Sequence, residues 1–340
     1  MNVRRLLPRD AIPSIDEPAF GAAYFGDPDD EVVVVEPESG PARAYPLRVL
    51  HYHEVINDVL GDDAVDGGPH EAGDRGTDGA VAAGGAGRAV AVTWCPICGS
   101  AVVYDRAVDG DVLEFGVSGK LADDDLVLYD RESGSEWKQS SGLAVSGPHE
   151  GRRLTVLPAG IVPYRRFEEA HPDGVVLDPA ASDARVGDAG AARRYYDPEP
   201  YEAYFARGGF GYEAIKGRPS VRDWDRDDLP PKAPVLGLGE GDHAVGVPYP
   251  VVVESGGVVE LDVDDRPVVV VATDDGFHAY EAPGFALEPT DDGRLVGDGT
   301  SWDPASGEGE DGRRLERVAA RRLFAFAWRD DHGPDRFYEV

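Results

Sequence analysis

Cysteine, methionine and lysine are scarce in this sequence. Its 340 residues include two cysteines, Cys95 and Cys98, and a single methionine. One methionine excludes a methionine-rich copper site. Two cysteines separated by only two residues do not make a disulfide framework, and this spacing indicates metal binding or thiol redox chemistry instead.

Long hydrophobic runs are also missing. No stretch approaches the roughly 18–20 apolar residues that cross a membrane. Residues 1–18 (MNVRRLLPRDAIPSIDEP) lack the apolar region of about 7–15 residues that a signal peptide needs. We therefore expect a cytoplasmic chain with no membrane span.

Positive charge is the third deficit. Acidic residues number 65 against 33 basic ones, which gives a formal net charge of −32. Nucleic-acid binding is excluded because phosphate contacts require clustered lysine and arginine. An acidic surface can attract a cationic partner. The composition is more typical of a protein from a high-salt cytoplasm, where ~1 M salt screens charges within about 3 Å.

The first part of the chain predicts two strands and a helix. Residues 32–36 and 42–47 have the composition of strands and are separated by the turn-like PESGP. Residues 46–60 (PLRVLHYHEVINDVL) predict a helix with proline near its start. Four residues recur at helical spacing and are expected on one face: Val49, His53, Ile56 and Leu60.

The segment from residue 61 to residue 87 is rich in glycine, alanine and aspartate and has no periodicity. We interpret it as a flexible insert that contains a solvent-facing His70. After the insert, strands are predicted at residues 88–94, 100–106, 111–121 and 125–139, the last as a hairpin. A short helix is expected in the segment YRRFEEAHPDG, which begins at Tyr164.

Several landmarks recur in the same order in the two halves of the sequence. GRRL stands at 151–154 and at 312–315, and upstream of each copy lies a strand-like run, RAVAV or RPVVVVA. Between these landmarks lies a tryptophan in each half, Trp137 after Glu136 and Trp302 after Ser301. This order predicts an internal duplication. WCPICGSAVVY corresponds to TDDGFHAY in the second copy, so the cysteine chemistry is expected in the first copy alone.

These patterns predict an α+β fold, rich in antiparallel strands and built from two related units. The first unit spans residues 1–180 and carries the cysteines and the insert. Residues 181–232 are interpreted as a linker with some helix or as a small subdomain. Residues 233–340 form the second, degenerate unit without cysteines.

The CPICG turn has two chemical uses. In a metal-binding knuckle, both thiolates point at one ion, and the glycine after the second cysteine supplies the positive φ of the turn. In a redox motif, the first cysteine opens a helix whose N-terminus lowers its pKa. The β-branched residues of SAVVYDR favour strand–turn–strand, and therefore the knuckle.

Two cysteines supply only half of a four-coordinate zinc site, and no second C-x-x-C motif occurs. His53 is the best candidate for the third ligand because it lies on the apolar face of the predicted helix. Glu54 and Asp58 are nearby carboxylates. The alternative is that His53 is a hydrogen-bonded core residue. A Cys2His set leaves a coordination position open, which suits a catalytic or transfer site.

Four segments of the sequence carry a resemblance to a known family: RDAIPSIDEPAF, ARAYPLRVLHYHEVINDVLG, VTWCPICGSAVVYDR and FGVSGKLADDDLVLYDRESGSEWKQ. They resemble the bacterial and archaeal family known as domain of unknown function 3179, over residues 8–180. The family has no established activity. The second half resembles it only loosely, as a degenerate repeat would.

The resemblance raises the importance of residues in three blocks: His53, Glu54, Asn57 and Asp58; Cys95, Cys98, Gly99 and Arg106; Ser118, Gly119, Asp125, Leu126, Tyr129, Asp130, Arg131, Trp137 and Gln139. The chain departs from the family pattern at Asp124 and Lys138. Glu54, Asp58 and four further residues are candidates to line a polar pocket: Arg106, Asp125, Arg131 and Gln139. The alternative for those four is a salt bridge or a turn.

The first functional hypothesis is a metal-binding protein in which Cys95, Cys98 and His53 hold zinc or copper. The second is a thiol-disulfide oxidoreductase in which Cys95 attacks and Cys98 resolves the mixed disulfide. The third is a non-catalytic structural or binding module. No nucleotide loop and no Gly-x-Ser-x-Gly motif occurs, so no nucleotide cofactor is expected.

Overall fold

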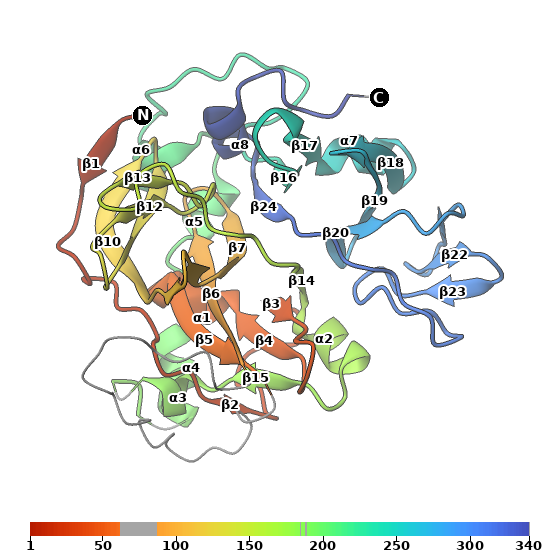
Figure 1. Ribbon diagram of the computed structural model, residues 1–340, viewed down its shortest axis with the longest axis horizontal. Coiled ribbons are helices and arrows are strands. Elements are labelled where there is room, and N and C mark those ends of the chain that lie inside the picture. The colour runs from red at the N-terminus through yellow and green to blue at the C-terminus, as the bar shows by residue number, and fades with distance from the viewer. Residues whose placement is uncertain (62–86, 184, 188, 340) are drawn as a thin grey trace.

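The computed structural model describes residues 1–61, 87–183, 185–187 and 189–339 (Figure 1). The insert predicted at 61–87, with His70, lies almost wholly outside the described residues. Within them the fold is α+β, as predicted, with mostly antiparallel sheets and short helices. No helix in this part of the chain is long and apolar enough to cross a membrane.

A six-stranded sheet carries the cysteines and contains strands from both halves of the chain. Its strands, in order across the sheet, are β17 (Val245–Pro248), β16 (Pro234–Leu238), β24 (Arg321–Phe324), β7 (Ser100–Asp105), β6 (Arg88–Cys95) and β5 (Val55–Leu60). In Figure 1, β24 lies between the teal β16 and the orange β7. Because β24 pairs with both, residues of the predicted first and second units share one sheet.

Two five-stranded sheets flank it in the first half. One contains, in order, β1 (Val3–Arg5), β10 (Phe115–Ala122), β11 (Asp125–Asp130), β12 (Glu136–Lys138) and β13 (Ala144–Ser146). The other contains β14 (Gly160–Pro163), β3 (Glu31–Val35), β4 (Arg43–Pro46), β15 (Val175–Leu177) and β2 (Phe20–Gly21). The first packs Phe115, Leu128 and Trp137 into one core with both cysteines. The second buries Val33 and Tyr45 in another.

Smaller sheets complete the β structure. Three strands form one sheet of the second half, β18 (Val258–Val263), β19 (Arg266–Thr273) and β20 (Gly276–Glu281), and three form another, β21 (Glu288–Pro289), β22 (Leu295–Gly297) and β23 (Thr300–Trp302). Strands β8 (Ala107–Val108) and β9 (Asp111–Val112) pair with each other. The second half has cores of its own, around Val270 and around Trp302.

The helices are short. Four follow strands directly or nearly so: α1 (Leu47–His53), α2 (Tyr164–Ala170), α7 (Tyr249–Glu254) and α8 (Ala325–His332). Four lie between residues 179 and 215: α3 (Pro179–Ser182), α4 (Ala189–Tyr196), α5 (Glu202–Ala206) and α6 (Gly211–Ile215). A 3-10 turn spans Gly241–His243. The segment 181–232 contributes Tyr196, Phe210 and Leu229 to the two cores of the first half.

The helix predicted at residues 46–60 is wrong in its second half. Helix α1 ends at His53 because Glu54 adopts a left-handed conformation, with φ 60° and ψ −22°. The following residues form β5, which pairs along its whole length with β6. Ile56 and Leu60 fit helical spacing, but Val55, Ile56 and Val59 are β-branched and favour a strand. Pairing with β6 decides between the two.

One run of elements occurs in the same order in both halves. Strand, strand, helix and three strands run from β3 to β7 and, apart from a 3-10 turn, again from β16 to β20. A later strand and helix follow each run, β14 with α2 and β24 with α8. β14 and β24 pair with the strands that begin these runs, β3 and β16.

Side chains and backbone make matching contacts in the two halves. The Tyr104 hydroxyl donates to the carbonyl of Gln139 at 2.7 Å, and the Tyr280 hydroxyl donates to the carbonyl of Pro304 at 2.7 Å. The leucine that ends each GRRL donates its N–H to a glycine carbonyl, Leu154 to Gly142 and Leu315 to Gly307. Both tyrosines are fully buried, so each hydroxyl bond fixes a loop against a core.

Substituting Tyr104→Phe is expected to lower the free energy of unfolding by about 1–2 kcal/mol. The change removes one buried hydrogen bond and leaves the Gln139 carbonyl without that donor. Urea unfolding measures the effect. Tyr195→Phe is the control, because Tyr195 is exposed, and it should change the free energy by no more than about 0.5 kcal/mol. Equal stability of the two variants would contradict the role given to the Tyr104 hydroxyl.

Candidate metal centre

The cysteines lie in a strand–turn–strand, as predicted from the sequence. Cys95 is the last residue of β6 and pairs with Ser100, the first residue of β7. Gly99 follows Cys98 with φ 56°, and a Cβ atom there would come within 2.7 Å of the Phe324 ring. The Cys98 carbonyl accepts a hydrogen bond from the Phe324 N–H at 2.7 Å. The turn is therefore held by β24, and no helix begins at Cys95.

Asp125 completes a group of three possible metal ligands with the two cysteines. The two cysteine sulfur atoms and one carboxylate oxygen of Asp125 all lie within 4.8 Å of one another, and all three side chains are buried. Asp125 begins β11, directly after a tight turn in which Asp123 and Asp124 both have positive φ. That turn brings Asp125 to the cysteines from a neighbouring sheet.

The two oxygens of Asp125 have different environments. Oδ2 accepts hydrogen bonds from the Ser140 N–H at 2.9 Å and from the Ser140 hydroxyl at 2.6 Å. Oδ1 is buried and has no hydrogen-bond partner among the described residues. An unpaired buried carboxylate oxygen costs free energy unless a donor or cation meets it. This oxygen is therefore available to a donor or a cation.

Burial disfavours the charged forms of all three groups. Burial raises the pKa of both thiols, that of Cys98 the more strongly. Burial also raises the pKa of Asp125 to about 6, although the charge of Lys138 acts in the opposite direction. A cation between the three side chains would reverse these shifts, because it stabilises thiolate and carboxylate directly.

A buried network behind Asp125 comes from both halves of the chain. The Ser140 hydroxyl also contacts Oδ2 of Asp331 at 2.5 Å, and Lys138 forms an ion pair with the other oxygen of Asp331. Asp331 belongs to α8. A hydroxyl has one proton, so Ser140 donates to only one of the two aspartates at a time.

Gln139 braces the base of the cysteine hairpin. Its side-chain N–H groups donate to the Thr93 hydroxyl at 2.8 Å and to the Ser100 carbonyl at 3.2 Å. Thr93 and Ser100 belong to the two strands that meet at the turn. Gln139 therefore supports the site without being among its three possible ligands.

His53 is not brought to the cysteines. Its Nδ1 lies 2.9 Å from the Pro13 carbonyl oxygen and its Nε2 lies 2.7 Å from the Tyr196 hydroxyl. The Oδ2 atom of Asp183 lies 3.8 Å from the same Nε2. Both ring nitrogens therefore have protein partners, and the reason is that α1 ends at His53 and directs this side chain toward α4. Asp125 takes the place at the cysteines that the sequence suggested for His53.

The remaining predicted pocket residues are distributed over the first half. Asp58 accepts hydrogen bonds from Arg43 at 2.6 Å and from the Tyr45 hydroxyl at 2.5 Å. Arg106 donates to two backbone carbonyls, and Arg131 forms partly exposed ion pairs. These contacts are structural. Glu54 is buried beside Trp94, whose backbone N–H donates to the Glu54 carbonyl at 2.9 Å.

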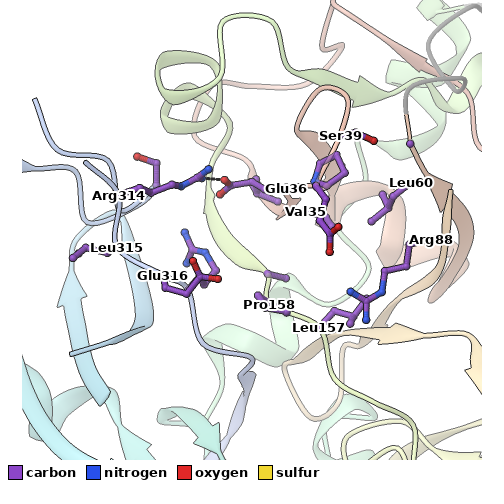
Figure 2. Close-up of a pocket in the computed structure, with 17 residues that line it drawn as sticks. Val35, Glu36, Ser39, Leu60, Arg88, Leu157, Pro158, Arg314, Leu315 and Glu316 are labelled. Carbon is purple, nitrogen blue, oxygen red and sulfur yellow. Dashed lines mark ion pairs between the residues drawn. The ribbon is translucent and has the colours of Figure 1, made fainter. Parts of the chain in front are cut away.

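A cavity of about 410 Å³ adjoins the cysteine turn. Its walls include the residues that precede Cys95 and follow Cys98, Trp94 and Gly99, together with His51, Phe205 and Phe324. A second cavity, of about 500 Å³, lies between the halves and contains the ion pair of Glu36 with Arg314 (Figure 2). None of the residues that line the second cavity belongs to the cysteine group.

Sequence reasoning missed three supporting residues, Ser140, Asp331 and Phe324. Ser140 follows Gln139 directly and carried no signal beyond its position beside the family block. Asp331 is 191 residues from Ser140 in sequence. No spacing rule connects residues so far apart, so only the pairing of β24 with β7 reveals them.

Substituting Ser140→Ala is expected to lower the free energy of unfolding by about 2–3 kcal/mol, because two buried carboxyl groups lose a hydrogen bond. Ser141→Ala is the matched control. The Ser141 hydroxyl is buried without a partner in the described structure, so its removal should cost about 0.5 kcal/mol or less. Chemical denaturation measures both, and similar losses in the two variants would contradict the network.

His51 predicts a pH dependence of stability. Burial lowers its pKa from 6.5 to about 4. The folded protein resists protonation of His51, so this contribution to stability is complete above pH 6.5 and is lost as the pH falls toward 4. Between pH 6.5 and pH 4, the free energy of unfolding of His51→Gln should therefore fall by about 2 kcal/mol less than that of the wild type. His243 has a largely exposed side chain, so His243→Gln should follow the wild type. Parallel plots of unfolding free energy against pH for His51→Gln and the wild type would contradict the lowered pKa of His51.

Comparison with known proteins adds a family and no activity. The model of a family described as "Protein of unknown function (DUF3179)" matches residues 9–66 and 81–335. The match continues through the second half, so the extent of 8–180 expected from the sequence was too short. No curated protein and no solved structure matches the chain. The chain belongs to the DUF3179 family of proteins of unknown function.

Proposed function

We propose that this protein binds one metal ion, zinc or copper, through Cys95, Cys98 and Asp125. The observation that carries the proposal is the unpartnered Oδ1 of Asp125, buried within 4.8 Å of two thiol groups. A buried carboxylate oxygen without a hydrogen-bond partner is unfavourable unless a cation meets it. The two thiols and this carboxyl group are ordinary ligands of a transition metal.

Zinc fits this ligand set better than copper. Zinc accepts thiolate sulfur and carboxylate oxygen together, whereas copper(I) favours soft sulfur ligands alone. The support behind Asp125 also suits a metal ligand, because Ser140 fixes one oxygen and leaves the other free. Three protein ligands leave a coordination position for water, a substrate or a further side chain.

A thiol-disulfide oxidoreductase is the weaker alternative. The nearness of the two sulfur atoms favours it. Three features disfavour it: both cysteines are buried, burial raises both thiol pKa values, and the first cysteine ends a strand. A reactive thiol requires exposure and a lowered pKa. A non-catalytic structural module is the remaining alternative, in which the cysteines only pack the turn.

We also propose that the two halves arose by duplication. The repeated order of elements and the matching bonds of Tyr104 and Tyr280 support this origin. Cys95 and Thr273 each close the corresponding hairpin, by pairing with Ser100 and Gly276. The first hairpin then carries an enlarged turn, and the metal centre is a property of that turn.

Metal analysis of the purified protein tests the proposed centre. The wild type should contain about one zinc or copper ion per chain, and Cys98→Ser and Asp125→Asn should each bind it at least tenfold more weakly. His53→Gln is the control, because His53 has partners elsewhere, and it should retain the metal.

Three outcomes would contradict the proposal. A metal-free wild type with a reversible Cys95–Cys98 disulfide would favour the oxidoreductase. A metal-free wild type without such a disulfide would leave the structural module. Loss of metal in His53→Gln, with full binding in Asp125→Asn, would restore the Cys2His set in place of Asp125.

A further inference from the structure

Glu54 has a backbone conformation that is unusual for glutamate. Its φ is 60°, in the left-handed region that favours glycine. Every other non-glycine residue with positive φ in the described part of the chain is an aspartate. Aspartate tolerates this region because its short side chain can bond locally to the backbone, whereas glutamate has no such advantage. Glu54 is therefore held in this conformation at a cost.

The corresponding position in the second half is a glycine. Gly257 directly precedes β18, as Glu54 precedes β5, and its φ is 92°. Its carbonyl accepts the N–H of Ala272 at 2.9 Å, and the Glu54 carbonyl accepts the N–H of Trp94 at the same distance. The backbone role is the same in both halves. A glycine fulfils it without strain, so the glutamate side chain requires a separate explanation.

One carboxylate oxygen of Glu54 is buried without a hydrogen-bond partner. The residue is 6% exposed, and its Oε2 has no hydrogen bond among the described residues. Burial raises the pKa of this carboxyl group to about 8. The unpartnered buried oxygen therefore adds a second free-energy cost to that of the left-handed backbone. Strain and unpaired burial together are typical of a functional position.

The position of Glu54 points to the cysteine group. The hydrogen bond from the backbone N–H of Trp94 to the Glu54 carbonyl places Glu54 beside Trp94, the residue that precedes Cys95. Val55, the residue directly after Glu54, lies in the same core as Cys95 and Cys98. The carboxylate is not one of the three ligand groups that lie within 4.8 Å of one another. Rotation about its side-chain bonds is needed to bring it onto an ion there.

We propose that Glu54 is the fourth ligand of the metal ion held by Cys95, Cys98 and Asp125. The inference rests on the metal centre proposed above. Two thiolates and two carboxylates around a divalent ion carry a formal charge of −2, the same as the common four-cysteine zinc site. The ion would supply the partner that the Glu54 carboxylate lacks, and it would explain why this half keeps glutamate where glycine is the unstrained choice.

Glu54→Gly and Glu54→Gln test the proposal. Glycine removes the strained glutamate, so the metal-free Glu54→Gly protein should melt at a temperature equal to or higher than the wild type. Both variants should bind zinc at least tenfold more weakly in a competition titration. With cobalt(II) as the probe, both should show altered intensity of the visible bands that report four-coordinate geometry.

The matched control is Asp264→Gly. Asp264 also has positive φ, lies in the turn between β18 and β19, and is far from the cysteines in the second half. It should leave zinc affinity and the cobalt spectrum unchanged. Wild-type affinity and an unchanged cobalt spectrum in both Glu54 variants would overturn the proposal. A wild type that binds neither metal would instead overturn the metal centre itself, so the two failures are distinct.

Discussion

The pairing of β24 with β7 is the contact on which the rest of this structure depends. It places strands of both halves in one sheet, and its end lies at the cysteine turn, where the Phe324 N–H bonds to the Cys98 carbonyl. Helix α8 begins immediately after β24 and carries Asp331 to Ser140. The thiols belong to the first half, but the second half holds the turn and buttresses Asp125. A site confined to one copy is therefore too simple a description.

Acidity has a conformational role in this chain as well as a role in solvation. The turns between β10 and β11 and between β18 and β19 both place paired aspartates at positive φ, Asp123–Asp124 and Asp264–Asp265. Other folds use glycine or asparagine in such turns. Part of the −32 charge is thus required by tight turns. A less acidic variant of the same fold would need asparagine or glycine at these positions, and alanine would strain them.

The strands around the cysteines were predictable because their signals are local. β-branched residues alternate through residues 88–94 and 100–106, and the CPICG turn separates them, so the hairpin could be recognised without knowledge of its neighbours. The segment after His53 was not predictable in this way. Its apolar residues fit both a helix and a strand, and the choice depends on β6, which lies beyond an insert of more than twenty residues.

The group of three possible metal ligands was predictable only in part. Both cysteines and Asp125 were among the residues singled out from the sequence, but no local rule ranks Asp125 above His53. Their distance from the thiols is set by how separate sheets pack and by the turn at Asp123–Asp124. The family resemblance was recognisable from four blocks, and its extent into the second half was not, because all four blocks lie before residue 140.

The thiols buried at the end of β6 have a consequence for the metal centre proposed above. Burial raises the pKa of both thiols, so each sulfur keeps its proton when no cation is bound. A cation that enters the proposed centre would replace these two protons, because thiolate is the form that binds metal. Loading would then acidify the surrounding solvent, and an acidic medium would oppose loading. The occupancy of the proposed centre would therefore be tied to proton concentration by the two buried cysteines.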